Sequence, residues 1–246
     1  MTTLTPMDRV SAGSARSRSA KPWLFRLRAA TGFNLAAGVA GGTFFLVLAL
    51  FVGLTAVSQA RALRISNFRA DGYLDLLTSV CMFVYYLTLW WLMLNRPLPI
   101  ARTDTVLPSF VAFMGTYLPC IWILFTADDA SKGRHLISAA LVLIGAIAMV
   151  VVIRYLGRSF SIVPQARRLV RSGPYAIVRN PLYLVEEIAQ FGFLVLFFSP
   201  LTLALFVAFG AVQVRRILYE EELLRGAFPD YDEYARSTPR LIPYVW

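Results

Sequence analysis

Two short groups of polar residues near the C-terminal end have the residue types needed to bind a charged small molecule. Arg216 and Glu220 stand four positions apart, so on a helix they share one face. Upstream, Asn180-Pro181 combines a residue favoured at the N-cap with one favoured at the first helical position. The free backbone N–H groups of such a first turn can bind a carboxylate. Together these residues predict a site for a polar, partly anionic ligand.

A stripe of polar residues continues along the helix that we expect after Asn180-Pro181. Tyr183, then Glu186 or Glu187, then Gln190 recur at helical spacing. The surrounding sequence is apolar, and ionisable groups at membrane depth usually face a cavity or a partner because their exposure to lipid is costly. The stripe therefore predicts one wall of a cavity.

Simpler interpretations of the same charges stay open. The two glutamates at 186 and 187 can lie at the membrane interface and pair with Arg171 or Arg179. Likewise, Arg216 and Glu220 can form a surface ion pair, which would stabilise the helix by only a few tenths of a kcal/mol. The sequence alone does not choose between these pairs and a functional site.

The elements that position these residues belong to a membrane protein. The chain has 246 residues, of which 58% are hydrophobic and 15% charged, a composition typical of integral membrane proteins. His135 is the single histidine, which argues against a His-based triad or a His-rich metal site. Cys81 and Cys120 lie in separate apolar runs and are interpreted as core thiols. We expect an all-α integral membrane protein without a metal site.

Four apolar runs are long enough to span a bilayer, which takes about 20 residues; they are 33–57, 73–94, 106–126 and 136–156. A further apolar region, 182–218, is too long for one span and is interrupted at Ser199-Pro200. It predicts two helices of about 17 residues each that form a hairpin and return the chain to the side it left. The chain therefore divides into a basic tail (1–32), four transmembrane helices (33–156) and a C-terminal region (157–246) that holds both polar groups.

The distribution of basic residues supports this topology. Lys and Arg outnumber Asp and Glu by 24 to 14, an excess that in membrane proteins marks cytoplasmic loops more often than a nucleic-acid partner. The Ser- and Arg-rich tail is expected to be disordered and cytoplasmic, with an organelle transit peptide as the alternative. The loops then expected outside carry Arg61, Arg64, Arg69, Lys132 and Arg134, and all other basic residues fall inside. The loop 157–182 and the tail 214–246 should meet on the cytoplasmic face.

Two motifs in the C-terminal region carry a family resemblance. "LVRSGPYAIVRNPLY" precedes the predicted hairpin, and "RILYEEELL" with "FPDYDEYARSTPRLIP" follows it. Over about residues 157–246 the chain resembles the isoprenylcysteine carboxyl methyltransferase family, which belongs to a wider group of integral membrane methyltransferases that includes phospholipid N-methyltransferases. The resemblance implies that S-adenosylmethionine donates a methyl group to a membrane-borne acceptor, a carboxyl or amine of a lipid or lipidated molecule.

The resemblance also implies roles for individual residues. Arg216 is expected to meet the acceptor, and Glu220 to act with it in catalysis. The family usually has His in an Arg-His-Pro-x-Tyr motif where this chain has Asn180, which keeps a donor and an acceptor but cannot carry charge. The cofactor contacts implied are Arg167, Arg168, Leu169, Val170, Tyr175, Asn180, Pro181, Leu182, Tyr183 and Glu220.

The physical interpretation of the residues is compatible with this cofactor. A helix N-terminus and arginines suit its carboxylate, a glutamate suits its ammonium or ribose, and tyrosines suit its adenine. One alternative is an NADPH-dependent membrane reductase of the sterol reductase type, which shares a terminus like "DEYARSTPRLIPYVW". Another is a small membrane transporter or assembly factor, which the absence of a visible internal repeat disfavours. We expect the inner membrane of a bacterium as the location, with the active site facing the cytoplasm.

Overall fold

The computed structural model describes residues 25–26, 31–65, 70–103, 105–120 and 130–242. Of the residues that the structure describes, 79% are helical, as the sequence predicts. Four helices in these described stretches are long and apolar enough to cross a membrane. They are α1 (Thr31–Ile65), α2 (Ala70–Leu94), α4 (Lys132–Leu156) and α7 (Pro200–Ala227).

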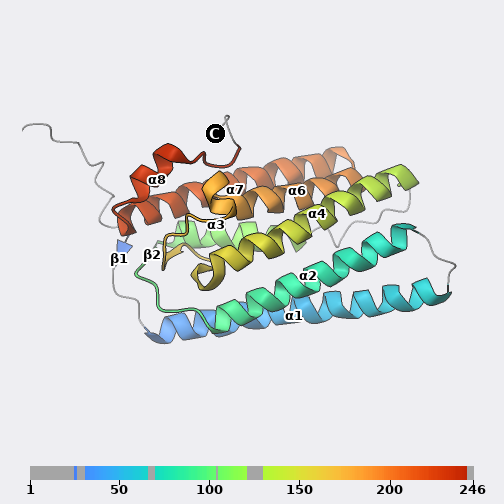
Figure 1. Ribbon diagram of the computed structural model, residues 1–246, viewed down its shortest axis with the longest axis horizontal. Coiled ribbons are helices and arrows are strands. Elements are labelled where there is room, and N and C mark those ends of the chain that lie inside the picture. Colours follow the sequence, from blue (N-terminus) through green and yellow to red (C-terminus); the bar gives the residue numbers. More distant parts are fainter. Residues whose placement is uncertain (1–24, 27–30, 66–69, 104, 121–129, 243–246) are drawn as a thin grey trace, which may run out of the picture.

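The long helices form an elongated bundle (Figure 1). α1 packs on α2, α2 on α4, and α4 on α6 (Pro181–Leu196), which lies beside α7. The shorter α3 (Val106–Tyr117) packs against α7. Helices distant in sequence therefore surround a common interior, and the predicted site residues lie on α6, on α7 or on the segment between α4 and α6.

The third predicted span differs from the helix observed there. α3 has 12 residues and continues into one further tight turn to Cys120, and the remainder of the predicted span, 121–126, lies outside the described residues. The fourth helix of spanning length is α7, which runs past the predicted end of the hairpin through the acidic residues. Glu, Leu and Arg dominate 220–225 and are strong helix formers, so the polar tail begins as helix.

The break between α6 and α7 lies at the predicted Ser199-Pro200. Ser199 caps α7, since its Oγ accepts from the Thr202 backbone N–H at 3.2 Å while Thr202 Oγ1 accepts from the Ser199 N–H at 2.8 Å. Pro200 occupies the first turn, where its missing donor costs nothing. That these two helices dip through the membrane and return stays a prediction.

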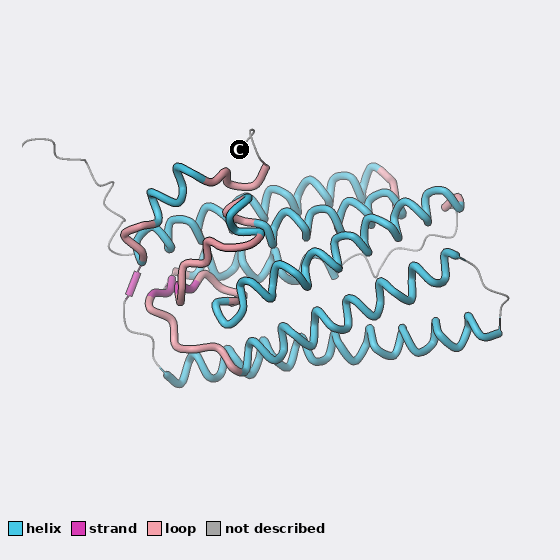
Figure 2. The backbone as a smooth tube through the Cα atoms, viewed as in Figure 1, coloured by secondary structure: helices cyan, strands magenta, loops and turns pink. Residues whose placement is uncertain are grey.

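Strands and most described loop segments gather at one end of the bundle (Figure 2). β1 (Phe25–Arg26), β2 (Ala101–Thr103) and β3 (Gln165–Ala166) form a small antiparallel sheet in that order. The helices α5 (Pro174–Ile177) and α8 (Tyr231–Ser237) lie at the same end. The rest of the predicted N-terminal tail, residues 1–24 and 27–30, lies outside the described residues.

The C-terminal tail is fixed to the start of α6. The backbone N–H groups of Arg179 and Asn180 donate to the carbonyl oxygens of Pro239 and Arg240, at 2.9 and 3.2 Å. The two polar segments expected to meet, the loop after α4 and the tail after α7, therefore do lie together.

Small residues allow α1 and α2 to pack closely against each other. A Cβ on Gly38 would lie 3.1 Å from the Met93 carbonyl oxygen, and one on Gly42 3.3 Å from Leu94 Cδ2. These glycines of α1 therefore pack on α2, as expected of a small-residue pair in a membrane helix.

Candidate active site

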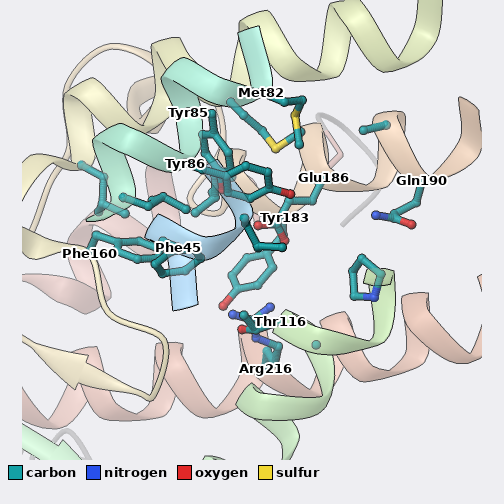
Figure 3. A pocket seen from close by; sticks show the side chains of 18 of the residues that line it. Phe45, Met82, Tyr85, Tyr86, Thr116, Phe160, Tyr183, Glu186, Gln190 and Arg216 are labelled. Atoms are coloured by element: carbon teal, nitrogen blue, oxygen red, sulfur yellow. The ribbon is translucent and has the colours of Figure 1, made fainter. Parts of the chain in front are cut away.

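A cavity of about 770 Å³ lies inside the bundle and reaches its loop-bearing end. One part of its wall is apolar and aromatic (Figure 3) and includes Phe45, Met82, Tyr85, Tyr86 and Phe160. The other part is polar and contains most of the residues to which the sequence assigned chemistry.

Tyr183 is the centre of the polar wall. Its hydroxyl donates a hydrogen bond to Glu220 Oε1, and the Arg216 guanidinium lies over its ring, 4.9 Å from the centroid. Both charges of α7 therefore face the cavity and contact the same tyrosine of α6. The surface ion pair that the sequence left open is the wrong interpretation of these two residues.

The position of Arg216 depends on a glycine of the neighbouring helix. Arg216 is buried, and its Nη1 donates to Gln213 Oε1 at 2.9 Å. A Cβ at Gly115 of α3 would lie 2.3 Å from Arg216 Cδ and 3.0 Å from Gln213 Oε1. Gly115 and Gln213 were not found from the sequence, because their roles depend on how α3 packs against α7.

The adjacent glutamates of α6 have different surroundings. Glu186 lines the cavity, where its Oε2 accepts from Gln213 Nε2 at 2.6 Å. Glu187 is not among the cavity-lining residues, and its Oε1 lies 3.8 Å from where a Cβ on Gly210 of α7 would be. The predicted polar stripe is therefore formed through Glu186.

The proposed pairing of these glutamates with nearby arginines does not occur. Arg171 pairs instead with Asp230 at 3.2 Å, and Arg179 with Glu221 at 3.2 Å. Both arginines thereby hold the C-terminal region against the loop after α4.

The segment Arg167, Arg168, Leu169 and Val170, for which the resemblance implies cofactor contacts, borders the cavity. Arg167 is buried, and its Nε donates to the Pro97 carbonyl oxygen at 2.8 Å. Burial, together with the nearby Arg96, lowers the pKa of Arg167 to about 10, so that it stays cationic at neutral pH. Its Nη1 is buried without a hydrogen-bond partner in the described part of the chain, which suits an anionic ligand group.

Tyr175 of α5 also lines the cavity. Gly173 precedes it with a φ of 61°, and a Cβ there would meet the Tyr155 ring at 2.3 Å, so the turn requires glycine. The Tyr234 hydroxyl donates to the Tyr175 carbonyl oxygen at 2.6 Å and fixes this turn to α8. Burial raises the pKa of Tyr175, which keeps its phenol neutral.

Asn180 stands at the predicted N-cap, but its side chain makes no capping hydrogen bond. Its Nδ2 donates instead to Glu221 Oε1 at 2.9 Å and to the Arg240 carbonyl oxygen at 3.1 Å. These bonds use the amide donor, whereas a cap would use the amide oxygen. The strong bond to a charged acceptor fixes the orientation of the side chain. Leu182 lines the cavity with Asn180, whereas Pro181 is buried at the helix start and is not part of the cavity wall.

Glu221 is a buried charge that the sequence analysis missed. Its side chain is 2% exposed and forms an ion pair with Arg179 at 3.2 Å. It also accepts a hydrogen bond from Arg240 Nε at 3.0 Å. A usable signal was present, because Glu221 follows the fully buried Ile217 by one helical turn and so shares the core-facing side of α7.

Comparison with known proteins places the polar wall inside a family segment. Residues 138–226, from α4 through most of α7, match the isoprenylcysteine carboxyl methyltransferase family. The resemblance recognised in the sequence is thereby confirmed for this segment. The matching family is one of methyltransferases, and the described part of this chain has helices of membrane-spanning length.

Two relatives share part of this similarity. The cobalt-zinc-cadmium resistance protein CzcN of Cupriavidus metallidurans is 38% identical over 76 residues, which is 30% of this chain and 35% of the relative. The nickel-cobalt-cadmium resistance protein NccN of Alcaligenes xylosoxydans xylosoxydans is 37% identical over 81 residues, 32% of this chain and 38% of the relative. The match thus spans little more than a third of either relative's length.

Proposed function

We propose that the protein transfers a methyl group from S-adenosylmethionine to a membrane-borne acceptor, a carboxyl or amine of a lipid or lipidated molecule. One observation carries this proposal. Tyr183, Arg216 and Glu220 form a contact cluster on the wall of a cavity whose other walls are apolar, and all three lie within the family segment.

The residues on the polar wall fit this cofactor. The buried, unpartnered Arg167 Nη1 matches its carboxylate, and the Glu220 carboxylate matches its ammonium or a ribose hydroxyl. Tyr175 offers an aromatic surface for adenine. When bound, the cofactor supplies an electrophilic methyl group. The chain's own residues orient the reacting groups and exclude water, which a direct displacement needs more than a strong base.

The apolar wall fits the hydrocarbon part of a lipid acceptor. Arg216 lies on the polar wall, and its Nε is buried without a hydrogen-bond partner among the described residues, so it is placed to orient an anionic group. We further propose a location in the inner membrane of a bacterium, with the loop-bearing end of the bundle facing the cytoplasm.

Cofactor binding by the purified protein tests the proposal directly. We expect S-adenosylmethionine or its demethylated product to bind in calorimetry, and a ligand at 100 times its dissociation constant to raise stability by about 2.7 kcal/mol. Clear binding of NADPH with no heat from either of these ligands would instead favour the reductase.

Variants of the polar wall separate its two roles. Glu220→Gln should weaken cofactor binding, because a charge-assisted contact is lost. Arg216→Ala should leave that binding intact but abolish turnover, and Arg216→Lys should restore little, since lysine lacks the planar fork. Glu222→Gln, on α7 but outside the cavity wall, is the control. Full turnover by both Glu220→Gln and Arg216→Ala would show that the site assignment is wrong.

A further inference from the structure

Glu186 is a cavity carboxylate for which methyl transfer as proposed above requires no role. It follows Tyr183 by about one helical turn and is half-buried, as expected of a side chain that lines a cavity. Gln213 holds its Oε2 at 2.6 Å. Its Oε1 makes no hydrogen bond or ion pair within the described part of the chain. One oxygen is therefore fixed by α7, and the other is left for a ligand.

The same glutamine fixes the position of Glu186 relative to Arg216. Gln213 is 2% exposed, its amide nitrogen donates to Glu186, and its amide oxygen accepts from Arg216 Nη1 at 2.9 Å. The hydrogen bonds to Glu186 and from Arg216 therefore favour the same orientation of the Gln213 amide. An anionic and a cationic group of the same wall are thus bridged by a single amide; Figure 3 shows Glu186 and Arg216 with Tyr183 between them.

The charges around Tyr183 favour a cationic acceptor. The wall brings together two carboxylates, Glu186 and Glu220, and one guanidinium, Arg216. A carboxylate acceptor that carries no positive charge of its own would raise the net negative charge of this wall, where screening is poor and repulsion strong. A protonated amine would instead complement the free oxygen of Glu186.

We propose that Glu186 is a catalytic residue that binds the protonated amine of the acceptor, so that the substrate is a lipid whose headgroup carries a primary amine beside an anionic group. This inference rests on the proposed function. One N–H proton passes to the Glu186 carboxylate, and the nitrogen lone pair forms the new N–C bond to the methyl group. The C–S bond breaks with its electron pair left on sulfur, which converts a sulfonium to a neutral thioether. Arg216 holds the anionic group of the same headgroup.

The chemical stability of the product tests the inference. Purified protein is given methyl-labelled cofactor with vesicles that contain an ethanolamine phospholipid, or with an S-farnesylcysteine probe as the carboxyl acceptor. Mild alkali releases the methyl group of an ester as volatile methanol, whereas an N-methyl group remains bound. We expect alkali-stable label in a phospholipid one methylene heavier than the substrate.

The other outcomes separate the inference from the function on which it rests. Label released as methanol, or cofactor binding without transfer to the amine vesicles, overturns the amine assignment and leaves a methyltransferase. The absence of both cofactor binding and transfer overturns the proposed function as well.

Matched variants of the adjacent glutamates test the role of Glu186 itself. Glu186→Gln keeps an oxygen for Gln213 but cannot accept a proton, so amine methylation should fall about 100-fold with cofactor affinity unchanged. Its rate should recover partly as the pH rises toward the pKa of the acceptor amine, because more amine is already neutral. Glu187→Gln lies outside the cavity wall and should keep both the rate and the pH profile. A wild-type rate and pH profile in Glu186→Gln would overturn the assignment.

Discussion

Loss of the Glu221 charge should release the C-terminal tail from the rest of the protein. Glu221 is 2% exposed and lies between the guanidinium groups of Arg179, which is 9% exposed, and Arg240, which is 24% exposed. Glu221→Gln would remove the carboxylate that both guanidinium groups contact, and breaking a buried ion pair costs about 3–5 kcal/mol. Because Arg240 keeps access to solvent, we expect about 3 kcal/mol, the lower end of that range.

The tail offers a local measure of this loss. Arg236 is exposed and lies in α8, which the interactions of Glu221 hold in place through Arg179. A loss of about 3 kcal/mol raises the population of the open tail by about 100-fold. Tryptic cleavage at Arg236 should accelerate by the same factor when opening is fast relative to cleavage.

The neighbouring Glu222 provides a matched control for this measurement. It is only half-buried and forms no ion pair with the described residues, so Glu222→Gln should be cleaved at the wild-type rate. Equal cleavage of Glu221→Gln and the wild-type protein, at several trypsin concentrations, would refute the argument that the buried cluster holds the tail.

Three further predictions concern the cavity and the topology. Tyr183→Phe removes the hydroxyl that donates to Glu220 but keeps the ring under Arg216, so cofactor affinity in calorimetry should fall by about tenfold, and unchanged affinity would contradict this. Gly115→Ala introduces a methyl group that overlaps Arg216 Cδ, so turnover should drop while cofactor affinity holds, and wild-type turnover would show that Arg216 has room to move. Cysteines in place of Ser172 and Ser237 should react with an impermeant maleimide added to the same side of the membrane. A cysteine in place of Ser199 should react only from the opposite side. Labelling of the Ser172 and Ser237 variants from opposite sides would rule out the topology.

Much of the fold was predictable because a membrane helix can be recognised from a local run of apolar residues. Hydrophobic length marks α1, α2 and α4, and the Ser199-Pro200 break marks the start of α7. The region around α3 was less accessible, since an apolar run of spanning length does not specify where a helix ends. The small sheet was also missed, because strands of two or three residues that pair across distant segments leave no periodicity to detect.

The candidate site was predictable where it depends on spacing along one helix. Arg216 and Glu220 share a face of α7, and Tyr183 and Glu186 share a face of α6. The contacts between those faces were not predictable, because they depend on how α6, α7 and α3 pack. Gly115 and Gln213 gain their roles only there, through atoms contributed by other helices.

Asn180 illustrates how tertiary partners change the meaning of a recognisable motif. Asn before Pro predicts a side-chain cap, and the family pattern has a histidine at this position. In the folded protein the amide nitrogen of Asn180 is occupied by Glu221 and by the Arg240 carbonyl oxygen. An amide fulfils this role without a charge, since Arg179 and Arg240 already balance the carboxylate. The residue therefore connects the start of α6 to the tail, and it borders the cavity because that connection holds it there.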